Sequence, residues 1–365
     1  MGLSLVILGF IFVIGLVVGS FLNVVILRTV SGESIVFPGS KCPKCQTPLK
    51  WYHNIPVLSY LFLRGKCGFC ASPISIQYPI IELLTGCVFV GLFLRFCVPF
   101  DPLFGLYAIN PISWFQVIVY VFSLVVSCLF IVIAGTDILE QKVADVHTYS
   151  LIGIGLFYSI FISVLNFVLF YHANGLPKID LEFFLTCPVL YSIAAGLIGF
   201  IIMEVFARLG LLLIGTRAFG EGDSYIAAGI GSVLGGFMGS SSLYSNFLPI
   251  FEALLCILVL SVIVQIILTL PVFLKRLADN KNWLTLSAIL IFIIYTIGYL
   301  YAQNSGWFAN TVAYWLSTVV LLILGLLTCR ELLFGLKEHR TSGMYLPFGP
   351  AMVISAFLAL VLIAI

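Results

Sequence analysis

Charged side chains are scarce in this chain of 365 residues. Asp, Glu, Lys and Arg make up 9% of it, hydrophobic residues make up 62%, and the mean hydropathy is +1.19. About a quarter of the residues in soluble domains are charged, so this composition excludes an ordinary soluble fold and predicts a polytopic membrane protein. The net charge of +2 carries no information about partners, because only the distribution of charge across a bilayer does. We expect a lipid bilayer around the chain and no nucleic-acid partner.

Several common sequence signals are also missing. Residues 1–27 have no basic start and no small-residue cleavage site, so we expect them to be retained as a helix and not removed as a signal peptide. No glycine-rich nucleotide fingerprint follows a predicted strand, so the chain offers no regular dinucleotide-type site. We find no low-complexity segment and no convincing internal repeat.

Long apolar runs dominate what is present. Ten stretches reach the length of about 20 residues that a membrane-spanning helix needs. They run near residues 3–27, 78–97, 113–135, 148–171, 187–213, 225–241, 249–274, 284–302, 311–329 and 346–364. The sixth is the weakest, because its glycines predict a segment that is either broken or tightly packed. We therefore expect an all-α polytopic membrane protein of about ten transmembrane helices.

The one long polar segment, between the first and second runs, contains two CxxC pairs. Their residues are Cys42, Cys45, Cys67 and Cys70. Each pair can turn two thiolates toward one ion, so the spacing predicts a closed tetrahedral zinc site. The surrounding prolines and glycines favour turns that bury little core, so folding of this loop is expected to depend on the metal. Two disulfides, an iron–sulfur cluster or four unrelated thiols are the alternatives.

Basic residues indicate the orientation. If the loop with the four cysteines is cytoplasmic, fifteen of the 17 Lys and Arg residues fall on the inner side, and only Arg95 and Lys178 fall outside. This distribution fits the positive-inside rule. A reducing cytosol would in turn favour a metal over disulfides at the four cysteines.

Two aspartates lie at the predicted inner ends of spans. Asp137 closes the third span, and Asp223 opens the sixth in the motif Gly220-x-Gly222-Asp223. A carboxylate at that depth is costly if it faces lipid, so each should face the bundle or a wet cavity. If the two meet, they would share one proton and act as base and acid on a water and a scissile carbonyl. Gly220 and Gly222, which have no Cβ, would let an extended substrate approach the carboxylate.

Four motifs together resemble one family. The stretches GSFLNVVILR at 19–28, Cys42 to Glu82 with WYHNIPVLSY between the cysteine pairs, and GEGD at 220–223 occur in the order found in type IV prepilin peptidases. The stretch LPFGP at 346–350 is similar to the C-terminal signature of that family. The chain thus resembles these GxGD-type aspartyl proteases over most of its length.

The resemblance implies an endopeptidase of the bacterial inner membrane. It would remove the short basic leader from membrane-inserted type IV prepilins or pseudopilins at the cytoplasmic face, with Asp137 and Asp223 as the catalytic aspartates. Members with a four-cysteine loop typically also methylate the new N-terminal amine with S-adenosylmethionine. The resemblance therefore implies a structural zinc ion and a methyl-donor site that the sequence does not locate.

Three departures from the family pattern stand out. Ala144 precedes Asp145 where the family usually has proline, and Ser224 and Tyr225 follow GxGD where the family often has lysine or valine-lysine. These changes alter loop stiffness and local charge without removing a carboxylate, so they bear on rate and specificity. Residues 281–338 add two spans, which we expect to be peripheral.

These observations predict five regions. They are a first transmembrane helix at 1–28, a cytoplasmic zinc-binding loop at 29–77, a protease core at 78–280, an inserted helix pair at 281–338 and a C-terminal helix at 339–365.

Other interpretations stay open. Asp137 and Asp223 could be interface charges that anchor helix ends, in a multi-span transporter with a regulatory zinc loop or a non-catalytic pilin assembly factor. A transporter is disfavoured because its usual paired broken-helix repeats are missing. Glu82 is expected to hold the loop to its helix or to contact an amine, and Glu204 and Glu252 to be partnered structural charges.

Overall fold

The computed structural model describes residues 2–37, 39–97, 100–101, 106–107, 114–140, 145–174, 187–214, 220–239, 248–279, 319–320 and 348–363. The chain divides into two compact units. One comprises Met1–Ala207, Phe219–Val262 and Pro347–Ile365, and the other comprises Arg208–Ala218 and Ile263–Leu346. Both candidate sites lie in the first unit, to which the following description refers.

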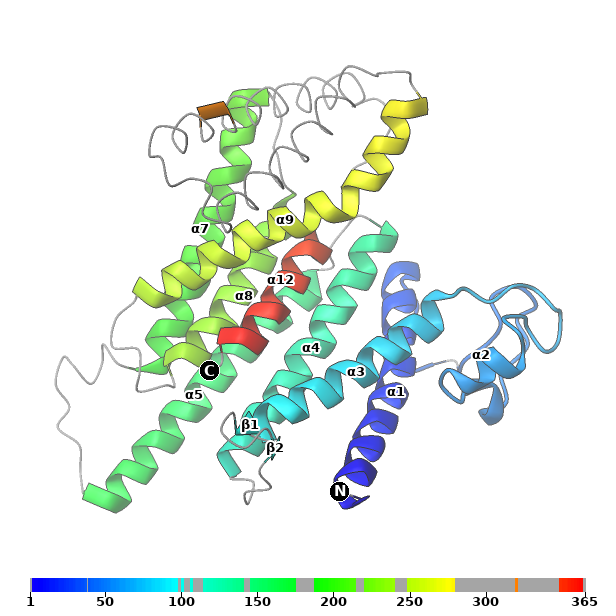
Figure 1. Ribbon diagram of the computed structural model, residues 1–365, viewed down its shortest axis with the longest axis horizontal. Helices are drawn as coiled ribbons and strands as arrows, with labels where there is room; N and C mark the ends of the chain where they lie inside the picture. Colours follow the sequence, from blue (N-terminus) through cyan, green and yellow to red (C-terminus); the bar gives the residue numbers. More distant parts are fainter. Residues whose placement is uncertain are drawn as a thin grey trace. The chain divides into compact units, whose positions relative to one another are not determined.

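Long helices make up most of the described residues (Figure 1). They are α1 (Gly2–Ser31), α3 (Gln77–Cys97), α4 (Trp114–Glu140), α5 (Asp145–Asn174), α7 (Pro188–Ile214), α8 (Glu221–Gly239), α9 (Leu248–Asp279) and α12 (Gly349–Ile363). Residues 32–76, which we call the cysteine loop, contain the short helices η1 (Trp51–Asn54) and α2 (Leu58–Phe62). A two-residue antiparallel strand pair, β1 (Phe100–Asp101) with β2 (Leu106–Tyr107), was not predicted; it pairs Phe100 with Tyr107.

Among the residues that the structure describes, five helical segments are long and apolar enough to cross a membrane. They are Val6–Ser31, Gln77–Cys97, Trp114–Glu140, Asp145–Val168 and Pro188–Arg208, and the segments Ala253–Gln265 and Gly349–Ala359 are apolar but shorter. The predicted helical membrane architecture is confirmed in this coarser form, whereas the count of ten spans is not. The predicted spans 284–302 and 311–329 lie outside the described residues, apart from 319–320.

Helix α8 shows which interpretation of the glycine-rich sixth span is correct. It is an unbroken helix that is mostly buried. A Cβ on Gly231 or Gly235 would collide with the backbone carbonyl of Ala195 or Tyr191 on α7. The glycines therefore permit close packing of neighbouring helices, as small residues do in membrane bundles, and they do not break the helix.

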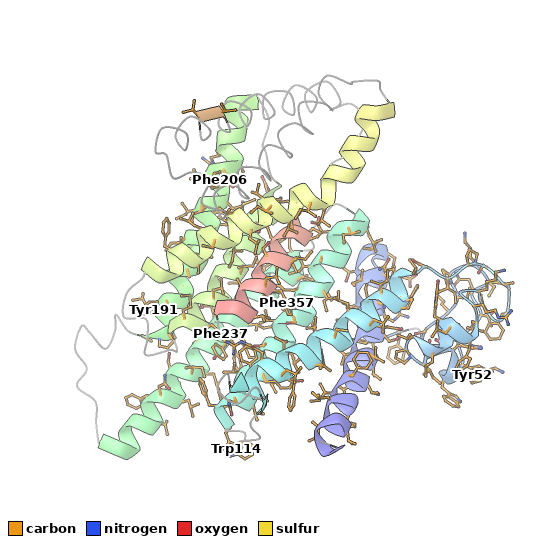
Figure 2. All side chains as sticks on the ribbon, viewed as in Figure 1. Tyr52, Trp114, Tyr191, Phe206, Phe237 and Phe357 are labelled. Carbon is orange, nitrogen blue, oxygen red and sulfur yellow. The ribbon has the colours of Figure 1, made fainter. Side chains whose placement is uncertain are left out.

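Aromatic rings and polar backbone contacts hold the remaining helices together. Phe237, labelled in Figure 2, stacks on Tyr158 with ring centroids 5.3 Å apart, and Tyr158 stacks on Phe122 at 4.0 Å. Between α1 and α3, Asn23 Nδ2 donates a hydrogen bond to Tyr78 O at 3.1 Å, so Asn23 links the two helices. The ends of α1 and α3 are thereby held side by side where the cysteine loop begins and ends.

Candidate functional site

The two CxxC pairs lie in two copies of one turn. Residues 41–48 (KCPKCQTP) and 66–73 (KCGFCASP) each close with a bridge between their first and last residues. In the first turn, Cys42 N–H donates a hydrogen bond to Thr47 O (3.0 Å) and Gln46 N–H donates one to Cys42 O (2.9 Å). In the second turn, the equivalent bonds run from Cys67 N–H to Ser72 O (2.8 Å) and from Ala71 N–H to Cys67 O (2.9 Å). Gln46 and Ala71 both have a left-handed φ, of 57° and 55°. This internal repeat was missed in the sequence, where KCxxCx(S/T)P occurring twice was the available signal.

The repeated turns bring four sulfurs together. The Sγ atoms of the four cysteines all lie within 4.8 Å of one another, and Cys42 Sγ and Cys70 Sγ are 3.9 Å apart. A zinc–sulfur bond of about 2.3 Å in a tetrahedron places sulfurs about 3.8 Å apart, whereas a disulfide needs about 2.05 Å. The cluster therefore fits a metal ion such as zinc and contains no disulfide.

Local hydrogen bonds favour the thiolate form that a metal requires. Hydrogen bonds, the largest from the backbone N–H of Cys45, lower the pKa of Cys42 from 9.0 to about 6 against the opposing effect of burial. At Cys67 the backbone hydrogen bonds are outweighed by burial and by the neighbouring thiols of Cys42 and Cys70, so the pKa of Cys67 is raised instead. The hydroxyl of Ser72, 3.1 Å from Cys70 Sγ, lowers the pKa of Cys70. Donors close to a thiol stabilise its negative charge, and the thiolate is the metal ligand.

Two buried charged side chains attach the cysteine loop to the helices. Glu82 of α3 accepts a hydrogen bond from Val57 N–H through Oε2 at 2.7 Å, directly before α2 begins, and the Ser20 hydroxyl of α1 lies beside the same carboxylate. Arg28, at the end of α1, donates to the carbonyls of Ser34 (2.8 Å), Ile35 (3.0 Å) and Gly39 (3.3 Å). Glu82 therefore holds the cysteine loop to α3, which is one of the two roles expected for it.

Asp137 is enclosed where three helices meet. It lies in the last turn of α4, which continues to Glu140, and it is 4% exposed. The backbone amide of Gly349 at the start of α12 faces its carboxylate, and a Cβ at 349 would overlap Asp137 Oδ2. Asp137 Oδ2 makes no hydrogen bond of ordinary geometry to any residue that the structure describes. A carboxylate at the C-terminal end of α4 is destabilised by the negative end of that helix dipole, and the positive N-terminal end of α12 offsets this effect.

Asp223 lies in the first turn of α8 and is 9% exposed. Its Oδ2 accepts a hydrogen bond from Gly220 N–H at 3.0 Å, which is one half of a capping box. Gly220 is exposed and Gly222 half-buried, and a Cβ at Gly220 would meet only Asp223 Oδ2 at 3.6 Å. Since that is ordinary contact, the capping geometry alone does not require glycine at 220.

The structure brings the two predicted aspartates together. Their carboxylates are close enough to interact electrostatically, and α12, red in Figure 1, packs against both α4 and α8. A third carboxylate lies nearby, since Ser224 Oγ donates to Glu204 Oε2 at 3.4 Å. Gly349 was not predicted to lie at this site, although PFGP at the start of the last helix was the available signal.

Comparison with known proteins identifies one family. A family model, the Bacterial Peptidase A24 N-terminal domain, matches residues 13–96, which run from α1 through the cysteine loop into α3. The Prepilin leader peptidase/N-methyltransferase of Klebsiella pneumoniae is 30% identical over 232 residues, which cover 62% of this chain and 84% of that protein. This chain belongs to the prepilin leader peptidase/N-methyltransferase family.

Other members of the prepilin leader peptidase/N-methyltransferase family differ in how much of the chain they match. The Neisseria gonorrhoeae protein is 31% identical over 248 residues, covering 61% of this chain and 72% of that protein. The Myxococcus xanthus protein is 56% identical over 87 residues, which cover 24% of this chain and only 26% of that protein. No solved structure matches the chain. The resemblance read from the sequence motifs is confirmed.

Proposed function

We propose that this protein is a membrane-embedded endopeptidase that removes the basic leader from type IV prepilins or pseudopilins. The observation that carries the proposal is that Asp137 and Asp223, from helices far apart in sequence, are both buried and lie close to each other. Membership of the family supports the substrate class, because the relatives in Klebsiella pneumoniae and Neisseria gonorrhoeae are named prepilin leader peptidase/N-methyltransferase.

The proposed chemistry is aspartyl hydrolysis without a covalent intermediate. One carboxylate, ionised, removes a proton from a water that attacks the scissile carbonyl carbon. The other, protonated, donates its proton to the carbonyl oxygen, and collapse of the tetrahedral intermediate releases leader and mature pilin. Burial of both groups favours a pair in which one carboxylate is ionised and the other protonated, because two adjacent carboxylates in a site of low dielectric do not both ionise.

A second proposed activity is methylation of the amine that cleavage exposes. The names of the relatives support it, and S-adenosylmethionine would supply the methyl group. The four cysteines would hold a structural zinc ion, since four thiolates complete a tetrahedral shell and leave no position for a substrate. Zinc would fix the shape of the cysteine loop.

The proposed setting is the bacterial inner membrane, with both candidate sites toward the cytoplasm. The distribution of basic residues supports this orientation. A prepilin anchored by its own hydrophobic helix would enter laterally and present its leader junction unwound, because a helical backbone keeps its carbonyls in intrahelical hydrogen bonds. Gly220 and Gly222 would then lie along the extended backbone of the substrate.

Mass spectrometry of a co-expressed prepilin tests this function. We expect Asp137→Asn and Asp223→Asn each to reduce leader cleavage at least about 100-fold, because each removes one partner of acid–base catalysis. Glu140→Gln is the matched control: it removes an exposed carboxylate one turn further along α4 and should cleave normally. A methyl increment on pre-cleaved substrate that persists in the Asn variants would establish the second activity as separate.

Two results would favour the rival functions. If the wild-type protein folds and leaves several candidate prepilins intact, a transporter or a non-catalytic assembly factor becomes the better interpretation. If Glu140→Gln reduces cleavage as strongly as Asp137→Asn, a general loss of interfacial charge explains the effect and the specific role of the aspartates fails.

A further inference from the structure

The cysteine loop exposes an apolar face that the proposed chemistry does not use. On α2, Leu58, Leu61 and Phe62 are 50%, 63% and 82% exposed, and their i, i+3, i+4 spacing places them on one side of the helix. Trp51 of η1 is 79% exposed, and its ring meets that of Tyr52 edge-on at 5.7 Å. Tyr52 lies at the outer surface of the loop (Figure 2). Exposed apolar surface of this kind marks an interaction site.

The start of α2 lies at the depth where α3 enters the bilayer. The 21 residues of α3 extend about 32 Å, close to the thickness of a hydrocarbon core, so Gln77 must lie near its boundary. Glu82 is five residues further along, about 7 Å deeper, and its Oε2 is 2.7 Å from Val57 N. Figure 1 shows α2 beside α1, next to the end of α3 that the loop joins. Since helical side chains lean toward the N-terminal end of their helix, the Glu82 carboxylate reaches back toward Gln77. The start of α2 is therefore held near the boundary between lipid headgroups and acyl chains.

The charge of the loop matches a lipid surface. Across residues 32–76 the sequence has five basic side chains and a single acidic one, Glu33. Lys50, Arg64 and Lys66 are exposed next to η1, α2 and the second turn, and Lys50 Nζ lies 5.9 Å from the centre of the Tyr52 ring. Aromatic rings combined with basic residues are typical of segments that bind the interface of a membrane containing anionic lipids.

We propose that the cysteine loop docks on the bilayer that its own helices cross. Leu58, Leu61 and Phe62 would enter the boundary between headgroups and acyl chains, while Lys50, Arg64 and Lys66 bind lipid phosphates. The competing occupant is a prepilin. Its leader is basic under the proposed function, so like charges oppose that alternative. Docking would hold the zinc-binding turns on the membrane surface.

Photocrosslinking of the full-length protein in nanodiscs tests the docking. Benzoylphenylalanine in place of Phe62 is expected to form adducts with phosphatidylglycerol, seen as lipid-sized mass increments. The same residue in place of Trp114, 85% exposed at the start of a candidate span, is the positive control. Lipid adducts at position 114 without any at position 62 would overturn the proposal. Crosslinks from position 62 to an added prepilin, with no lipid adduct there, would overturn it too.

The contribution of charge has its own measurement. The variant Lys50→Gln/Arg64→Gln/Lys66→Gln is expected to lower the yield of lipid adducts at 62 at least about threefold in phosphatidylglycerol, because each basic residue near an anionic surface favours binding. Replacing phosphatidylglycerol with phosphatidylcholine should do the same. Equal yields in the two lipids contradict anionic docking. The zinc content of each variant reports that the loop is folded.

Discussion

The cysteine loop and the aspartate pair are built in opposite ways. The four sulfurs come from two copies of one eight-residue turn, held by hydrogen bonds between residues close in sequence. The aspartates come from α4 and α8, and the backbone of α12 completes their surroundings. The metal site therefore depends on local chemistry, whereas the aspartate pair depends on how whole helices pack.

This difference predicts that the two sites fail separately. Loss of a thiolate should open the loop while the helices around Asp137 and Asp223 stay in place. A side chain added at a helix contact should displace a carboxylate while the four sulfurs stay together. Variants that alter one site, with prepilin cleavage and zinc content both measured, test whether the two sites are independent.

Removal of the metal should have the largest effect. Structural zinc in small peptides contributes about 10–16 kcal/mol, and the cysteine loop has little core to replace it. We expect Cys67→Ser to abolish zinc binding and to make residues 32–76 rapidly cleavable by protease, as measured by metal analysis and limited proteolysis. Cys256→Ser, at an exposed cysteine of α9, is the control and should keep zinc. Full zinc content in Cys67→Ser would show that the four thiols do not act as one site.

Gly349→Ala should act on the aspartates alone. The added Cβ would overlap Asp137 Oδ2, and overpacking of this kind costs about 1–3 kcal/mol. We expect prepilin cleavage to fall about 100-fold, as about 2.7 kcal/mol of lost transition-state stabilisation would give, with zinc content unchanged. Gly153→Ala in α5, where no neighbouring atom lies within 4 Å of the added Cβ, should cleave normally. Normal cleavage by Gly349→Ala would mean that the start of α12 does not constrain the aspartate pair.

The same contrast explains how much could be predicted from the sequence. The cluster of four cysteines followed from spacing alone, because both residues of each CxxC pair lie in one turn. The long helices followed from apolar runs, with ends differing by a few residues; α4, for example, continues past its predicted end at 135 to Glu140. The repeat of the two turns was also readable from residues 41–48 and 66–73, and it was missed.

Features that depend on tertiary packing could not be read in the same way. Glycines in the sixth span left two interpretations, and only the backbone of α7 behind Gly231 and Gly235 decides between them. The approach of Gly349 to Asp137 joins helices far apart in sequence, so the PFGP stretch marks the residue but does not show which side chain it meets. Strands β1 and β2 have two residues each, too few for an alternating pattern to be visible.

Glu82 should give the smallest effect, at a contact that joins the locally folded cysteine loop to the packed helices. Glu82→Leu removes the acceptor for Val57 N–H, and loss of such a hydrogen bond costs about 1–3 kcal/mol. We expect proteolysis near α2 to become about tenfold faster, Glu82→Gln to have a weaker effect because one acceptor oxygen remains, and zinc to stay bound in both variants. Glu33→Gln, at an exposed carboxylate of the same loop, should match the wild type. If Glu82→Leu also loses zinc, the sulfur cluster depends on α3 and is not the locally built site that the repeated turns indicate.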